Sequence, residues 1–123
     1  MAIAAASAVD GFRFFGGEEL VGPPLLWSEC RSAIHEQRWR REISAELAAR
    51  TIQALESAPL AEANPADLGA RAWEIADRLG WAKTYDAEYL ALAQILGCRL
   101  VTLDLRLKRG SAPLGLAVSP DEL

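Results

Sequence analysis

Apolar residues recur at helical spacing along most of the chain. Residues 25–41 contain neither proline nor glycine, and Leu26, Cys30 and Ile34 fall on one face, which predicts an amphipathic helix. A second helix is expected to begin after the N-cap Ser44 and to form a hairpin with the first. The same spacing extends this second helix over residues 44–57 and predicts two further helices, over residues 68–79 and 86–96. The last of these is apolar on nearly every side, so it should be covered by other elements.

Short apolar runs between these helices predict strands. Residues 2–9 have no helical stripe and end at the turn signal Asp10-Gly11. Residues 98–103 have β-branched character and end at Asp104. Further short strands are expected before Pro23, in the linker over residues 59–65 and at residues 116–118. Near-continuous apolar strands that alternate with helices indicate an α/β fold, with a mostly parallel central sheet and helices on both faces.

Length and composition favour one folded domain over residues 1–123. The chain has 123 residues, of which 51% are hydrophobic and 24% charged, as in globular proteins. No stretch of about 18 apolar residues is present, so we expect no membrane helix. Because the apolar N-terminus lacks the basic flank of a signal peptide, we expect a cytoplasmic protein.

Any metal site in this chain is expected to use oxygen ligands. His35 is the single histidine, and Cys30 and Cys98 lie far apart without forming a CxxC pair. A zinc site built from histidine and cysteine would need more such ligands than the chain has.

Two clusters of basic residues offer contacts to nucleic acid, although the net charge of −4 gives no overall attraction to phosphate. An equally good explanation is that they complement a helix dipole and coat a solvated loop. The clusters are Arg38, Arg40 and Arg41, and Arg99, Arg106, Lys108 and Arg109.

Three acidic residues stand where chemistry is expected in an α/β fold. Asp104 follows a predicted strand, and ligands bind beyond the carboxyl ends of parallel strands. Asp86 lies in the first turn of the buried helix, where it could also act as a cap in competition with Thr84. Glu29 lies among apolar neighbours in the first helix, and taken alone it is better explained by an ordinary surface position. Should the three converge, their oxygens would suit Mg²⁺ or Mn²⁺ and allow phosphodiester hydrolysis.

Three segments resemble the PIN-domain ribonucleases, the VapC-type toxins in particular. They are Pro23–Glu29, Thr84–Ala93 and Leu100–Asp104, and both their order and their distances agree with that family. The resemblance covers about residues 20–123 and implies a three-layer PIN-like fold.

This resemblance also implies a site and partners. It places Glu29, Asp86 and Asp104 around Mg²⁺ or Mn²⁺ as metal-binding and catalytic residues, with Thr102 lining the site as a hydroxyl donor. It further implies an RNA substrate, a VapB-like antitoxin protein as partner and a homodimer.

The N-terminus departs from the family pattern. The family opens with a strand that ends in an aspartate, followed by a small residue and Ser or Thr. Alignment on Ser7 puts Ala5 in place of that aspartate, and Asp10 could replace it only if the register is shifted. The segment before Glu29 is also shorter than the resemblance leads us to expect.

Two functional hypotheses follow from this sequence. The first is a metal-dependent endoribonuclease toxin of a VapBC-type toxin–antitoxin system. The second, which Ala5 favours, is a catalytically impaired PIN-like scaffold that acts as a protein-binding or antitoxin-sequestering dimer.

Overall fold

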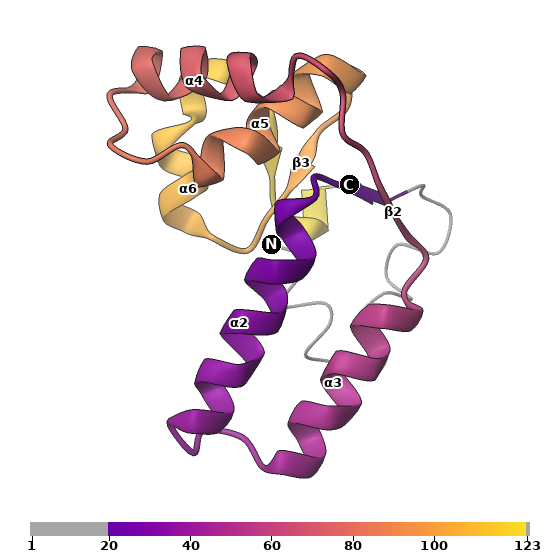
Figure 1. Cartoon of the computed structure of the whole chain (residues 1–123). Coiled ribbons are helices and arrows are strands. Elements are labelled where there is room, and N and C mark those ends of the chain that lie inside the picture. The colour runs from indigo at the N-terminus through magenta and orange to yellow at the C-terminus, as the bar shows by residue number, and fades with distance from the viewer. Residues whose placement is uncertain (1–19, 123) are drawn as a thin grey trace. The chain divides into compact units, whose positions relative to one another are not determined.

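The computed structural model describes residues 20–122, which fall into two compact units that divide after Glu62 (Figure 1). The predicted strand at residues 2–9, with Ala5 and Ser7, lies outside the described residues, and so does Asp10. Each unit combines helices with a pair of parallel strands. The α/β class and the parallel pairing of strands are therefore confirmed.

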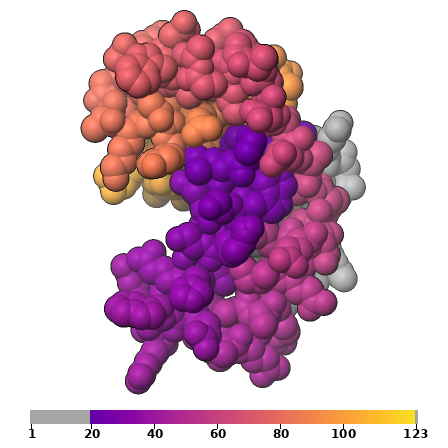
Figure 2. All heavy atoms as spheres, in the orientation of Figure 1, coloured from indigo at the N-terminus to yellow at the C-terminus, as the bar shows by residue number. Residues whose placement is uncertain are grey.

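The first unit contains the predicted helical hairpin. Helix α2 spans Leu25–Trp39, helix α3 spans Ala45–Ser57, and the two pack against each other. In Figure 2 the indigo spheres of α2 and the magenta spheres of α3 meet near the turn that joins the helices. The predicted apolar face of α2 is buried, and Ser44 caps α3 by accepting a 3.0 Å hydrogen bond from the Leu47 N–H. The hairpin and its cap are confirmed.

A short parallel strand pair completes this unit. Strand β1 (Leu20–Gly22) pairs with β2 (Leu60–Glu62), with Leu20 opposite Leu60. Gly22 allows α2 to begin close behind β1, because a Cβ at this position would lie 3.2 Å from the Leu26 side chain. Pro23 then accepts a 3.0 Å hydrogen bond from the Leu26 N–H and starts the helix.

The second unit is built around the predicted buried helix. Helix α5 (Tyr85–Leu96) packs against α4 (Leu68–Leu79), and Ala87 and Leu90 of α5 are completely buried. Both helices end at a glycine in the left-handed conformation, Gly80 at φ 71° and Gly97 at φ 66°. These two helices lie where their apolar spacing predicted them.

The second strand pair is shorter than predicted. Strand β3 covers only Leu100–Val101 and pairs in parallel with β4 (Ala117–Val118). The predicted strand start at Cys98 is wrong because its N–H donates to the Ala93 carbonyl and so closes the end of α5. After the strand the chain turns at once into helix α6 (Leu105–Gly110), which was not predicted. Two 3₁₀ helices follow, at Ala112–Leu114 and Pro120–Glu122.

None of the helices formed by residues 20–122 combines the length and the apolar character needed to cross a membrane.

Candidate acidic site

Asp86 projects from the first turn of α5. Thr84 takes the N-cap position but makes no side-chain capping hydrogen bond. The unpaired N–H groups of a first helical turn favour a carboxylate at this position. Asp86 is exposed to solvent, whereas the next residue, Ala87, is fully buried. The buried helix therefore presents an accessible acid at its N-terminal end.

Asp104 holds the turn between β3 and α6. Its Oδ1 atom accepts hydrogen bonds from the backbone N–H groups of Arg106, at 2.9 Å, and Leu107, at 3.2 Å. The position of Asp104 after the strand was predicted, whereas its role as the N-cap of a helix was not. The signal was present, because an aspartate before a proline-free run such as Leu105–Arg109 is a helix start.

Thr102 fixes the backbone that carries Asp104. Its side chain is 2% exposed, and its Oγ1 atom accepts a 3.0 Å hydrogen bond from the Asp104 N–H. The Thr102 N–H donates to the Val118 carbonyl at 2.9 Å, which ties the turn to β4. Thr102 thus supports Asp104, and its predicted role as a hydroxyl donor in the site stays a prediction.

The charge of Asp104 acts on the Asp86 carboxyl group. Although the Asp86 residue as a whole is exposed, partial desolvation of its carboxyl group raises its pKa; the negative charge of Asp104 raises the pKa further, and the Arg106 guanidinium lowers it. The second unit therefore brings together two of the three predicted acids from separate elements. The negative charges of two neighbouring carboxylates repel each other, and a bound cation would reduce that repulsion. The pair therefore suits a divalent metal ion.

Glu29 lies on α2, in the first unit. Burial raises the pKa of the neighbouring Cys30 thiol, and the Glu29 carboxylate adds to that increase. Within either unit, no group of three or more His, Cys, Asp or Glu side chains among residues 20–122 is arranged to hold a metal ion. The convergence of Glu29 with Asp86 and Asp104 stays a prediction.

Part of the second basic cluster has a structural role. Lys108 forms an ion pair with Glu122 and donates a 3.0 Å hydrogen bond to Ser119. Arg99 donates to the Glu122 carbonyl at 3.5 Å. Of the four cations in this cluster, Lys108 and Arg99 therefore secure the end of the described chain, while Arg106 lies within the field of Asp86.

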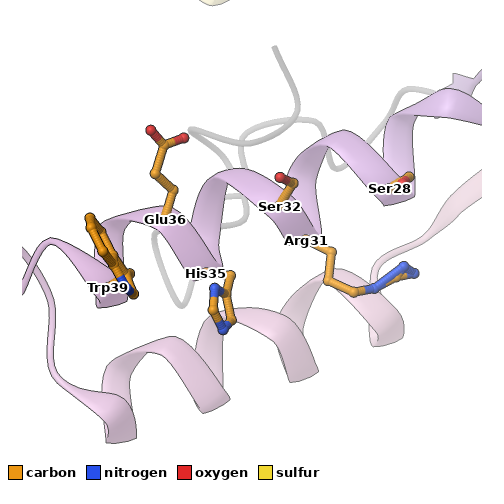
Figure 3. A pocket seen from close by; sticks show the side chains of 6 residues that line it. All are labelled: Ser28, Arg31, Ser32, His35, Glu36 and Trp39. Carbon is orange, nitrogen blue, oxygen red and sulfur yellow. The ribbon is translucent and has the colours of Figure 1, made fainter.

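Helix α2 borders a hollow of about 560 Å³, which was not predicted from the sequence. Its described lining comes entirely from that helix (Figure 3). The lining residues are Ser28, Arg31, Ser32, His35, Glu36 and Trp39. The signal for this groove was the four-residue spacing of its polar side chains on one helix.

Comparison with known families decides the classification. The PIN domain family matches residues 2–112, which is most of the chain. The chain belongs to the PIN domain family. The match spans both units and confirms the resemblance seen in the sequence motifs.

Two named relatives of this PIN domain come from mycobacteria. VapC ribonuclease Mb0985 of Mycobacterium bovis is 34% identical over 109 residues, which cover 88% of this chain and 84% of the relative. Ribonuclease VapC9 of Mycobacterium tuberculosis H37Rv shows the same identity over the same shares of both chains. These relatives identify this PIN domain as a VapC-type protein.

Proposed function

We propose that this protein is a Mg²⁺- or Mn²⁺-dependent endoribonuclease, the toxin of a VapBC-type toxin–antitoxin system. The observation that carries the proposal is the electrostatic coupling of Asp86 and Asp104, which lie in two of the segments that resemble the family. The ribonuclease names of two relatives that are 34% identical support it. The reaction is hydrolysis of a phosphodiester bond in RNA.

The donor chemistry of the acidic pair fits a hard divalent cation. Asp86 and Asp104 offer carboxylate oxygens, and Mg²⁺ accepts one or two carboxylates together with water and substrate phosphate. Asp104 uses Oδ1 to cap α6, and a carboxylate has a second oxygen that can bind a cation. Glu29 is proposed as a third ligand, and Asp10 is the remaining acid for the N-terminal corner. When bound, the ion polarises a phosphoryl oxygen and lowers the pKa of the attacking water.

The protein's own contribution is to position these groups. The first turn of α5 carries Asp86 at the exposed end of the helix, and the Thr102 hydroxyl accepts a hydrogen bond from the Asp104 N–H. The Arg106 guanidinium, which lowers the pKa of Asp86, can also contact the phosphate backbone of RNA. Its charge would position the substrate without reading its sequence.

The proposal includes the setting in which the enzyme works. We infer a single PIN-like domain over residues 1–123, a homodimer and a VapB-like antitoxin that covers the acids. The match to one family over residues 2–112 supports the single domain. We place the protein in the cytoplasm, where its RNA substrate would be.

A cleavage assay tests this function. Purified protein with Mn²⁺ should cut a structured RNA, and Asp86→Asn should abolish cutting. Asp77→Asn is a matched control, because Asp77 is an exposed aspartate on α4 outside the site. No cleavage by the wild type, or cleavage that survives in Asp86→Asn, would contradict the proposal.

The alternative is a PIN-like scaffold with impaired catalysis, and Ala5 is the observation that favours it. One lost carboxylate weakens the attraction for a divalent cation, although it also reduces repulsion among the remaining acids. Replacing Ala5 by aspartate tests this alternative. If the wild type binds no Mn²⁺ and cuts no RNA while Ala5→Asp does both, the scaffold hypothesis is correct.

A further inference from the structure

The groove on α2 is built from two rows of side chains. Arg31, His35 and Trp39 form one row at intervals of four residues, and Ser28, Ser32 and Glu36 form the other. Residues four apart are neighbours on a helix surface, so each row is continuous. In Figure 3 Ser32 and Glu36 point to one side of α2, and Arg31 and His35 point to the other.

The described lining of the groove contains one cation, Arg31, that forms no ion pair. The one acid of its described lining, Glu36, forms a 2.5 Å ion pair with Arg40 and is thereby neutralised. Among residues 20–122, Arg31 forms no ion pair, and neither does Arg38, which stands beside Trp39 in the sequence. Arg31 therefore offers the groove an exposed cation, and Arg38, which is exposed but does not line the groove, adds positive charge on the same helix.

Trp39 provides an aromatic surface at the end of the groove. Its side chain is 76% exposed, which is unusual for so large an apolar group. The other five lining residues that the structure describes are polar, so an apolar peptide would bury little apolar area against them. An exposed aromatic ring on the same helix face as an unpaired cation matches single-stranded nucleic acid, whose bases stack on aromatic rings while its phosphates contact basic side chains.

The groove has a length that fits this ligand. Arg31 and Trp39 are eight residues apart on α2, which corresponds to about 12 Å at the helical rise of 1.5 Å per residue. A stacked strand advances about 3.4 Å per nucleotide, so a few nucleotides could lie between the two side chains. Hydroxyls of Ser28 and Ser32 could donate to phosphate or ribose oxygens along the same path.

We propose that the α2 groove binds a single-stranded segment of RNA, with a base stacked on Trp39 and a phosphate on Arg31. This inference rests on the proposed function in taking RNA as the substrate, and it adds a binding surface on residues separate from the acidic pair. It also gives a role to the first basic cluster, because Arg38 adds positive charge on the helix that carries the groove.

A binding experiment in an inactive background tests the groove. Full-length Asp86→Asn protein is titrated into a labelled 12-nucleotide oligouridylate, and fluorescence anisotropy measures the affinity. Adding Trp39→Ala should weaken binding about tenfold, because stacking on an aromatic side chain is lost. Adding Arg31→Gln should lower the dependence of log K on log salt by about 0.7, the value for one lost phosphate contact to a single strand.

The second unit supplies matched controls. Trp73 on α4 is 66% exposed, and Arg78 lies on the same helix, so Trp73→Ala and Arg78→Gln change the same residue types outside the groove. Neither should alter RNA binding. Trp39→Phe should retain most of the affinity because it keeps an aromatic face. That recovery would distinguish stacking from a general effect on folding.

The outcomes separate this inference from the proposed function. Unchanged RNA affinity in Trp39→Ala, or an equal loss of affinity in Trp73→Ala, would contradict the proposal that the groove binds RNA. Loss of antitoxin binding in Trp39→Ala with RNA affinity intact would also overturn it and assign the groove to a protein partner. If the wild type binds RNA through Trp39 but does not cut it, the proposed nuclease activity is wrong and RNA binding by the groove is supported.

Discussion

Asp104 raises the pKa of Asp86 through its negative charge, in addition to the larger effect of burial. Asp104→Asn should therefore lower the pKa of Asp86 in the metal-free protein. Asparagine is also a good N-cap, so α6 should remain intact. NMR titration of the Asp86 carboxyl carbon measures this pKa, and an unchanged value would show that the two groups do not interact.

The same coupling affects stability. The folded-state pKa of Asp86 lies above its unfolded value, so the metal-free protein loses stability as pH rises through that folded pKa. Asp86→Asn should accordingly be slightly more stable than the wild type at neutral pH. The gain should be at most about 1 kcal/mol, because Asp86 is exposed and solvent screens its charge. Urea denaturation without metal measures it, and a variant less stable than the wild type would refute the prediction.

Thr102 should be needed to hold the acidic turn. Thr102→Val keeps the shape of the side chain but removes the acceptor of the Asp104 N–H, at a cost of about 1–3 kcal/mol for the unpaired donor. Thr51→Val is a matched control. Thr51 is also buried, and its hydroxyl only donates to the Leu47 carbonyl within α3. Equal losses of unfolding free energy in the two variants would argue against a special role for Thr102.

The helices of this protein could be predicted because their signals are local. Ser44, Gly80 and Gly97 mark helix ends through their own side-chain or backbone chemistry, and the structure places them there. The extent of β3 could not be predicted, because the Schellman-type closure of α5 uses Cys98 as a donor to Ala93. This hydrogen bond depends on how α5 ends, and the apolar pattern of the following strand does not predict it.

The candidate site was predicted only in part for a similar reason. Asp86 and Asp104 were recognisable from motifs, and their coupling follows from the packing of α5 near the turn after β3. The α2 groove was missed because each lining residue, such as Arg31 or Trp39, has an ordinary explanation when taken alone. The groove is recognisable as a binding surface only when its residues are seen to share one helix face and Glu36 is seen to pair with Arg40.

Glu122 should stabilise the second unit in a pH-dependent way. Hydrogen bonds from Lys108 and then Ser119 lower its pKa from 4.5 to about 2. The stabilisation is therefore fully present above the unfolded-state value of 4.5 and is lost as pH falls toward 2. Glu122→Gln should lower the melting temperature at pH 7 and leave it unchanged near pH 2. Asp121→Asn is the control, and a loss of equal size at both pH values would contradict this account.

The most direct test of the central claim is Mn²⁺ binding, followed by electron paramagnetic resonance. The wild type should take up Mn²⁺, and Asp86→Asn and Asp104→Asn should each weaken that binding about tenfold or more, since even groups that only support metal ligands contribute this much. Asp77→Asn should bind as the wild type does. Equal Mn²⁺ affinity in all four proteins would show that Asp86 and Asp104 do not form a metal site.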